Sequence, residues 1–289
     1  MSNEKKLLKI YKNFVKKTSR GHGFSKNLCI KKIMNSLESN LKSNFAEIQG
    51  SKMYLDQKDS LRLSINGVYG ELDTITIKQN VKKNDIVIDV GANIGYYTLL
   101  FSRLVGNLGK VFGFEPEPYN FELLKKNVEI NNYNNITFEQ KAISKNSGTI
   151  NLYLAKNGIV GHRIYNSDVC NGSIKVEMIS LDDYFSKLDL TDKIDFVKID
   201  VEGAELGVFK GMEKILNESK NLKIFSEFNR DVIKNEGSNP NEILEILNQH
   251  NFTINYVDNK QNLVRKITSN ELITSNNIIE ENVNILCTK

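Results

Sequence analysis

Two glycines four positions apart form the clearest chemical pattern in this chain. They lie in the stretch Asp89-Val90-Gly91-Ala92-Asn93-Ile94-Gly95, after an apolar run and before residues at helical spacing. Because glycine has no Cβ, a ligand can approach such a backbone closely. The spacing is G-x-x-x-G and not the G-x-G-x-x-G of dinucleotide sites. Asp89 at the turn suits a cationic or amine-bearing ligand better than a phosphate.

An acid follows this turn at the spacing that suits a ribose. Glu115, in Phe114-Glu115-Pro116, lies twenty positions after Gly95. An acid about 20 residues beyond a glycine turn can accept hydrogen bonds from both hydroxyls of a ribose. Turn and acid together predict an adenosine-containing cofactor, and the amine-tolerant turn favours S-adenosylmethionine over NAD. The alternative is an ordinary turn followed by a chance acid.

A second group of acids follows two later apolar runs. It consists of Asp200, Glu202 and Glu205 after one run and Glu227 at the end of the next. Open α/β sheets bind their ligands at the carboxyl ends of the strands. Methyl transfer from a sulfonium needs an aligned acceptor oxygen and a base for its proton. Asp200 is the candidate base. Asp200 with Glu202 or Glu227 is instead a candidate Mg²⁺ site, whereas Glu202 and Glu205 could simply favour a helix N-terminus.

Histidine is scarce, which makes one position of interest. Of His22, His162 and His250, only His162 lies near the predicted acceptor side. A histidine base works near neutral pH, so His162 is a further catalytic candidate beside Asp200. Glu227 is another catalytic candidate. Arg163 next to it could hold a phosphate or carboxylate of the acceptor. For both, a solvated loop position is the alternative.

The elements that must position these residues alternate between strand and helix, which predicts a parallel α/β sheet. The apolar patterns predict strands at Ile86–Val90, Lys110–Phe114, Ile136–Gln140, Phe196–Ile199, Leu222–Phe228, Phe252–Val257 and Asn282–Cys287. They predict helices at Asp73–Gln79, Tyr96–Leu104, Glu117–Asn131, Glu202–Asn217 and Asn241–Gln249. Residues 148–181 interrupt the alternation, and we interpret them as a hairpin-like insertion with a loop at Asn157–Gly172.

The N-terminal part is different in charge and pattern. The chain has 289 residues and a net charge of +4, yet residues 1–32 carry ten basic side chains and a single acid. Amphipathic spacing predicts helices at Glu4–Thr18 and Lys26–Phe45, then short strands at Ala46–Leu55 and Ser60–Ile65. The basic helices are either a solvated face or a contact for an anionic surface such as lipid headgroups, phosphate or nucleic acid.

Taken together, these motifs resemble the FkbM family of S-adenosylmethionine-dependent methyltransferases. The resemblance runs from about residue 67 to residue 228. Besides the glycine turn and Phe114-Glu115-Pro116, its marks are Ala142-Ile143-Ser144 with Gly148, Ser180-Leu181-Asp182-Asp183, and the most specific block, Lys198-Ile199-Asp200-Val201-Glu202-Gly203-Ala204-Glu205. It implies a Rossmann-like class I methyltransferase sheet of seven strands, mostly parallel with the last antiparallel. It also implies methylation of hydroxyls, chiefly on sugars, polyketides and related glycans.

The resemblance also implies a set of cofactor-binding residues. Glu115, with Pro116, would hold the ribose, and Gln140 to Ala142 would border the adenine. Asp200 is a further cofactor-binding candidate. The methionine part would be surrounded by Asp89, Gly91, Ala92, Asn93 and Gly95, and the cofactor would be approached by Tyr69 and Glu71 from a short Gly-aromatic-acid stretch.

These patterns divide the chain into a basic helical extension, residues 1–45, and a methyltransferase domain, residues 46–289. Within the domain we expect a cofactor half at about 67–145, the insertion at 148–181 and the acceptor side at 195–289. The scattered Cys29, Cys170 and Cys287 fit a reducing compartment and no cysteine-based zinc site. No stretch of about 20 apolar residues and no signal-peptide core is present, which predicts a cytoplasmic location, with peripheral membrane attachment open.

The absence of two sequence motifs narrows the range of expected acceptors. The chain has no Asn/Asp-Pro-Pro-Tyr/Phe run and no Cys after a Pro at a strand end. Methylation of an adenine amine or of pyrimidine carbon 5 is therefore not expected, and no DNA partner is expected. The family resemblance implies transfer to a hydroxyl, and we expect a sugar in a glycan or glycolipid precursor as the acceptor. RNA ribose methylation using the basic N-terminus, and a non-catalytic cofactor-binding scaffold, are the alternatives.

Overall fold

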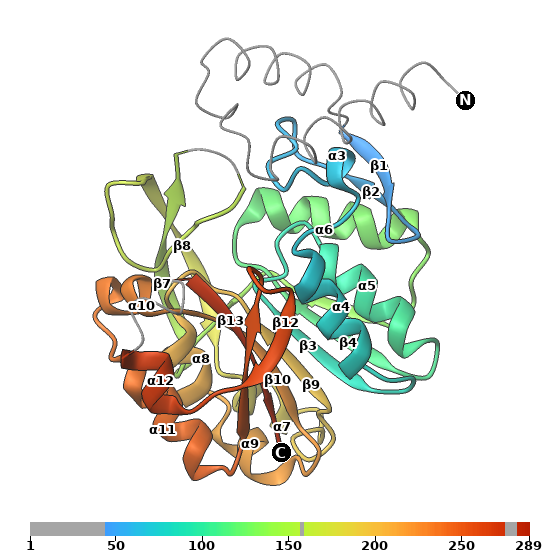
Figure 1. Ribbon diagram of the computed structural model, residues 1–289. Coiled ribbons are helices and arrows are strands. Elements are labelled where there is room, and N and C mark those ends of the chain that lie inside the picture. Colours follow the sequence, from blue (N-terminus) through green and yellow to red (C-terminus); the bar gives the residue numbers. More distant parts are fainter. Residues whose placement is uncertain (1–43, 157–158, 275–281) are drawn as a thin grey trace. The chain divides into compact units, whose positions relative to one another are not determined.

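The computed structural model describes residues 44–156, 159–274 and 282–289 (Figure 1). The predicted helix at Glu4–Thr18 and nearly all of that at Lys26–Phe45 lie outside these residues. The chain forms two compact units, residues 1–69 and 70–289. The basic surface predicted for residues 1–32 therefore stays a prediction.

The N-terminal unit contains a short hairpin and one helical turn. Strands β1 (Phe45–Ile48) and β2 (Ser51–Tyr54) pair antiparallel around Gln49 and Gly50, which both have positive φ, so the segment predicted as a strand at Ala46–Leu55 forms a hairpin. The predicted strand at Ser60–Ile65 is wrong, because this segment turns into helix α3 (Leu63–Asn66). Carboxylates of two aspartates accept the backbone N–H groups there, which favours a turn over a strand.

The second unit is built on one large sheet. Among the described residues eight strands pair in the order β12-β11-β13-β10-β9-β3-β4-β5. Their bounds are β3 (Ile86–Val90), β4 (Lys110–Phe114), β5 (Ile136–Glu139), β9 (Phe196–Ile199), β10 (Lys223–Asn229), β11 (Thr253–Asp258), β12 (Leu263–Lys266) and β13 (Asn282–Thr288). All seven predicted strands are present. The predicted strand count is wrong by one, because the edge strand β12 pairs with β11.

The strand directions fit the class I methyltransferase arrangement. Strands β3, β4, β5, β9 and β10 are parallel to one another, whereas β13 is antiparallel to both β10 and β11. The chain moves from β3 outwards to β5 and then returns to β9 on the other side of β3. Between β3 and β9 the order reverses, and ligands of open α/β sheets bind at such a switch point.

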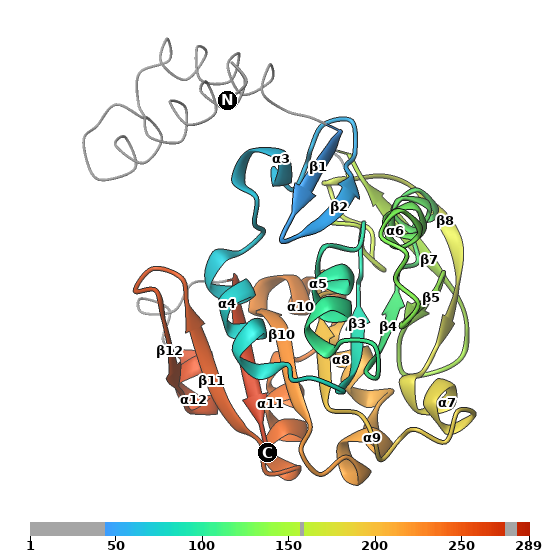
Figure 2. The same ribbon diagram turned by 90° about the vertical axis from the view of Figure 1, so that its right-hand side faces the viewer.

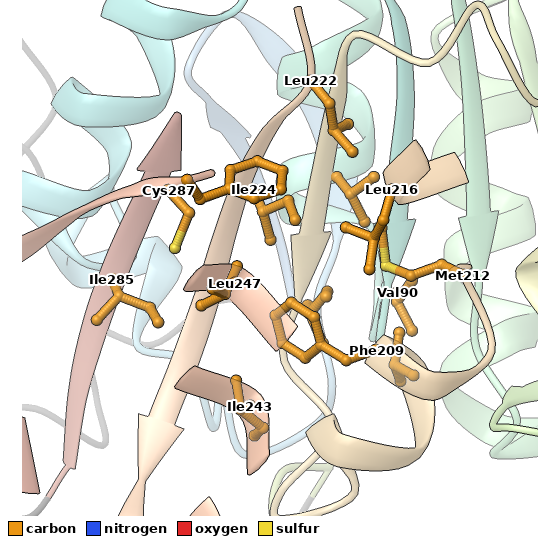
Figure 3. Close-up of a cluster of buried hydrophobic side chains, with 14 of the residues drawn as sticks. Val90, Phe209, Met212, Leu216, Leu222, Ile224, Ile243, Leu247, Ile285 and Cys287 are labelled. Carbon is orange, nitrogen blue, oxygen red and sulfur yellow. The ribbon is translucent and has the colours of Figure 1, made fainter. Parts of the chain in front are cut away.

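Helices cover both faces of this sheet (Figure 1). One face carries α4 (Glu71–Asn80), α5 (Tyr96–Val105) and α6 (Pro118–Ile130). The other carries α7 (Leu181–Ser186), α8 (Glu205–Lys210), α9 (Glu213–Glu218), α10 (Arg230–Glu236), α11 (Pro240–Gln249) and α12 (Ser269–Thr274). Apolar side chains fill the space between sheet and helices, including Val90, Phe209, Leu216, Ile224 and Leu247 (Figure 3).

One predicted helix is divided. The segment Glu202–Asn217 forms α8 and α9, with Gly211 between them. A Cβ on Gly211 would lie 2.2 Å from the carbonyl oxygen of Ser144, so the chain approaches its neighbour too closely there for a larger residue. Across the described residues, no helix combines the length and apolar character needed to cross a bilayer.

The predicted insertion is a separate three-stranded sheet. Strands β6 (Ala142–Ile143), β7 (Gly148–Ala155) and β8 (Cys170–Ile179) pair in the order β6-β8-β7, with β7 and β8 antiparallel. Figure 2 shows β7 and β8 as a long hairpin apart from the strands of the large sheet. Residues 148–181 thus contain the expected hairpin, but Cys170–Gly172, which were predicted as part of its loop, belong to β8.

Candidate functional site

The glycine turn after β3 packs against the end of β9. Gly91 has a φ of +77°, and a Cβ there would lie 1.9 Å from the carbonyl oxygen of Asp200. Gly95 has a φ of +93°, and its Cβ would meet Leu124 at 2.7 Å. Larger residues are excluded at both positions by backbone angle and by space. The turn and Asp200, predicted from separate motifs, thus meet at the switch point of the sheet.

Glu115 is fixed beside this turn at the end of β4. Its Oε2 accepts a hydrogen bond from the Asn93 N–H at 2.8 Å, and its Oε1 accepts one from the Glu117 N–H at 2.9 Å. The side chain is buried, and this burial raises the pKa of Glu115 to about 7, although both hydrogen bonds oppose the rise. A carboxylate has about four acceptor positions, so two remain for a ligand.

Lys198 is a buried cation that links the two motifs. The sequence patterns alone indicate no role for it. The Nζ of Lys198, on β9, lies 3.4 Å from Asp89 Oδ1 and 3.4 Å from Asp200 Oδ2. It also lies 3.3 Å from the carbonyl oxygen of Gly91 and 5.3 Å from the centroid of the Tyr97 ring. Burial by itself lowers the pKa of Lys198, but the charges of the two aspartates outweigh it and raise the pKa. Lys198 is therefore a charged link between Asp89 and Asp200.

Asp89 is buried beneath the glycine turn. Its side chain is fully buried, Oδ2 accepts a hydrogen bond from the Thr98 hydroxyl at 2.6 Å, and Oδ1 faces Lys198. Lys198 already provides a cation for this carboxylate, and its contact with the amine of a cofactor stays a prediction. Asp89 acts on the turn by holding Lys198.

Asp200 lies at the end of β9 and is partly accessible. About a third of the Asp200 side chain is exposed. Glu202 follows with a φ of +55°, and its Oε2 lies 3.9 Å from Nη2 of Arg163. Burial raises the pKa of Glu202, the nearby charge of Asp200 raises it further, and Arg163 lowers it. Glu227 lies within β10 opposite Asn284, two residues before the strand ends, and not at its end as predicted.

The predicted Mg²⁺ site receives no support. Within residues 44–156, 159–274 and 282–289, no group of three or more His, Cys, Asp or Glu side chains is placed to hold a metal ion. Asp200 instead has the ammonium group of Lys198 as its cation.

The insertion reaches the glycine turn. The side-chain amides of Asn93 and Asn120 both donate to the carbonyl oxygen of Ile159, at 2.8 and 2.9 Å. Nδ1 of His162 accepts a hydrogen bond from the Ala155 N–H at 3.0 Å, and burial lowers the pKa of His162. A neutral ring that accepts at Nδ1 carries its proton on Nε2. His162 thus supports the hairpin in this structure, and its role as a base stays a prediction.

The sequence that forms this site matches the model of a known protein family. The profile of a family described as "Methyltransferase FkbM domain" matches residues 89–254, which is more than half of the chain. The chain belongs to this FkbM methyltransferase family.

Individual relatives are more distant. "Hexuronic acid methyltransferase AglP" of Haloferax volcanii is 30% identical over 189 residues, covering 64% of this chain and 71% of that protein. "Methyltransferase 1" of Beauveria bassiana is 22% identical over 148 residues, covering 45% of this chain but 59% of that protein. The crystal structure of methyltransferase FkbM from Methylobacillus flagellatus is 16% identical with a TM-score of 0.42, over 71% of this chain and 44% of that one. The chain thus spans about three fifths of the Beauveria protein.

The remaining predicted residues of this FkbM-family chain differ in exposure. Gln140 is exposed after β5, and Ala142 is buried in β6. Ala92 is buried in the turn, and Pro116 follows Glu115 half-buried. Tyr69, in the N-terminal unit, and Glu71, at the start of α4, are exposed. Their contacts with a cofactor stay predictions.

Glu205 holds the turn that follows Asp200. Its Oε1 accepts the N–H groups of Val201 at 3.2 Å and Gly203 at 3.1 Å, whereas Oε2 is buried without a hydrogen-bond partner among the described residues. The side chain is fully buried, and this burial raises the pKa of Glu205 to about 7. This geometry favours the alternative in which Glu205 stabilises the N-terminal end of a helix.

The raised pKa of Glu205 predicts how stability depends on pH. Its pKa is above the ordinary 4.5, so the folded state binds the proton more tightly than the unfolded state. This contribution is fully present below about pH 4.5 and is lost as the pH rises to about 7, with a total of roughly 3 kcal/mol. Glu205→Gln keeps an acceptor oxygen but cannot ionise. Its melting temperature should fall less between pH 5 and pH 8 than that of the wild type, measured by circular dichroism.

The exposed acid Glu213 provides the control for this measurement, because Glu213→Gln should leave the pH profile unchanged. Glu115 titrates in the same range, so the Glu205→Gln profile should be flatter but not flat. Profiles of Glu205→Gln and wild type that run parallel would show that Glu205 is not the group responsible.

Proposed function

We propose that this chain transfers a methyl group from S-adenosylmethionine to a hydroxyl, in particular one on a sugar of a glycan or glycolipid precursor. The observation that carries the proposal is the meeting of three features at the switch point of the sheet. The glycine turn packs on Asp200, and Glu115 is hydrogen-bonded to the turn. The membership of the FkbM methyltransferase family supports this assignment of the site.

The residues present fit this cofactor. Gly91 and Gly95 leave the turn without side chains, so the methionine part can lie against its backbone. Glu115 has two acceptor positions in addition to those used by Asn93 and Glu117, which suits the two hydroxyls of a ribose. When bound, the cofactor supplies a methyl group already activated by its sulfonium.

Asp200 is the proposed base. The reaction requires that the acceptor oxygen is aligned behind the methyl carbon and that its proton is removed. Asp200 stands at the carboxyl end of β9 with part of its carboxylate exposed, and the Lys198 ammonium group at 3.4 Å orients it. The acceptor hydroxyl would donate its proton to the Asp200 oxygen that does not face Lys198.

A sugar acceptor is supported by one relative. The Haloferax protein, whose name refers to a hexuronic acid, is 30% identical over most of its length. A sugar hydroxyl is a poor nucleophile without a base, which agrees with an exposed carboxylate at this position. RNA ribose methylation relies on residues 1–32, outside the described residues, and the structure offers no separate observation that favours it.

Asp200→Asn should separate binding from chemistry. The amide retains the size of the side chain but cannot accept the proton, so turnover should fall roughly tenfold or more. The dissociation constant of S-adenosylmethionine, measured by calorimetry, should change little. The exposed Asp231 gives the matched control, since Asp231→Asn should leave both values unchanged. An unchanged turnover number in Asp200→Asn would transfer the base role elsewhere, first to His162.

The acceptor class can be found with labelled methyl. The protein is incubated with methyl-labelled S-adenosylmethionine and host lysate divided into small molecules, glycan, lipid-linked glycan, protein and RNA, with and without nuclease. We expect label in a glycan or lipid-linked glycan fraction. Nuclease-sensitive label would replace the sugar acceptor by RNA. A protein that binds the cofactor but labels no fraction would be a non-catalytic scaffold.

A further inference from the structure

Two buried polar groups of the insertion have no hydrogen-bond partner in the described part of the chain. They are Nε of Arg163 and the hydroxyl of Tyr165. The two side chains lie together, with the Arg163 guanidinium carbon 5.5 Å from the centroid of the Tyr165 ring. Buried polar groups in folded proteins are nearly always paired, so a neighbouring pair without an acceptor indicates that a ligand supplies one.

The backbone holds this pair in place. Arg163 forms a bridge with Tyr153 of β7, with its N–H donating to Tyr153 at 3.0 Å and its carbonyl oxygen accepting from Tyr153 at 2.7 Å. From there its side chain extends to Glu202, at the loop after β9. Glu202 follows Asp200 by two residues, so the pair lies on the acceptor side of the site.

Glu202 does not satisfy Arg163. The distance of 3.9 Å between Nη2 and Oε2 is an ion pair but too long for a hydrogen bond. The guanidinium therefore keeps its planar set of donors, which match the two oxygens of a carboxylate or phosphate. Burial raises the pKa of Tyr165 above its ordinary value, so its hydroxyl keeps its proton at neutral pH and can donate as well.

We propose that Arg163 and Tyr165 form a subsite for an acidic group, a carboxylate or phosphate, carried by the acceptor beside the hydroxyl that is methylated. This inference rests on the proposed function and specifies its acceptor as an acidic sugar. It makes Arg163 and Tyr165 residues that determine specificity and leaves proton removal to Asp200.

The test compares acidic and neutral sugars by binding, with and without S-adenosylhomocysteine. Methyl glucuronoside, glucose 6-phosphate and methyl glucoside are titrated into the full chain by NMR. We expect one acidic probe to bind roughly tenfold or more tightly than the neutral one, as for a charge-assisted bidentate contact. The titrations with methyl glucuronoside and glucose 6-phosphate show whether the subsite accepts a carboxylate or a phosphate.

Substitutions identify the side chains that cause the preference for acidic sugars. Arg163→Gln should remove it, and Tyr165→Phe should reduce it a few-fold. Glu202→Gln should strengthen binding of the acidic probe, because Glu202 competes for the same guanidinium. Arg265 is the matched control, since it also lies over a tyrosine ring, 5.2 Å from the Tyr256 centroid, on the edge strand β12. Arg265→Gln should keep the full preference.

Equal binding of acidic and neutral sugars by the wild type, or an unchanged preference in Arg163→Gln, would overturn the subsite. Failure of the proposed function is a different result. It would appear as absence of methyl transfer to any sugar fraction, whereas the binding preference is read without turnover.

Discussion

Replacement of Lys198 by methionine is expected to lower the free energy of unfolding by about 3–5 kcal/mol, the range for breaking a buried ion pair from one side. Methionine has a similar length but no charge. Asp89 would then keep the Thr98 hydroxyl as its hydrogen-bond donor and lose the cation that faces its other oxygen. An uncompensated charge would lie under the glycine turn, so we also expect weaker cofactor binding. Urea unfolding followed by circular dichroism measures the first effect, since the chain has no tryptophan.

An exposed pair provides the control for this variant. Lys210 lies 2.6 Å from Glu242, and both side chains are about a third or more exposed. Surface pairs contribute at most about 1 kcal/mol, so Lys210→Met should change stability little. Adding Asp89→Asn to Lys198→Met should restore part of the lost stability, because the buried charge is then absent. If Lys198→Met unfolds at the same urea concentration as wild type, or the double variant is no better than the single one, Lys198 does not link the two motifs as described.

Replacement of Glu115 by alanine is expected to weaken S-adenosylmethionine binding roughly 100-fold or more. This estimate follows from two hydrogen bonds to a charged group, at about 1.5–3 kcal/mol each. The loss has a second component, because the N–H groups of Asn93 and Glu117 lose their acceptor and the turn is less well fixed. The fold should survive, since the rest of the β4 end and the core behind it are unchanged.

Calorimetric titration of the cofactor measures this effect, and the circular dichroism spectrum checks the fold. Glu122→Gln, on the exposed side of α6, removes one negative charge from the same region without contact to the turn and should bind like wild type. Glu115→Gln retains one acceptor oxygen, so its cofactor affinity should lie between those of Glu115→Ala and wild type. An unchanged cofactor affinity in Glu115→Ala would remove the ribose assignment.

Local patterns predicted most of the large sheet. The apolar runs of β3, β4, β9 and β10 and the glycines after β3 act within a few residues, so sequence reasoning could find them. The edge strand β12 was missed because it has four residues, most of them exposed, and pairs on one side only. The division of Glu202–Asn217 was missed because it depends on the contact of Gly211 with Ser144, more than sixty residues earlier.

The candidate site was predicted as a set of residues but not as a set of contacts. Asp89 and Asp200 both belong to recognisable motifs, yet the sequence does not show that Lys198 lies between them. It also does not show that Asn93 and Asn120 share the Ile159 carbonyl oxygen, or that Arg163 faces Glu202. These contacts join segments that lie far apart in the chain, so they require the folded structure.

The central claim, transfer of a methyl group to a sugar hydroxyl, is tested most directly by the bond in the product. The purified chain is incubated with methyl-labelled S-adenosylmethionine and the glycan fraction, and the labelled carbohydrate is treated with mild alkali. A methyl ether on a hydroxyl survives alkali, and NMR should connect the labelled methoxy group to a ring carbon. Label released as methanol would show a methyl ester on a carboxylate, and label absent from carbohydrate would show a different acceptor. Either of these results would contradict the claim.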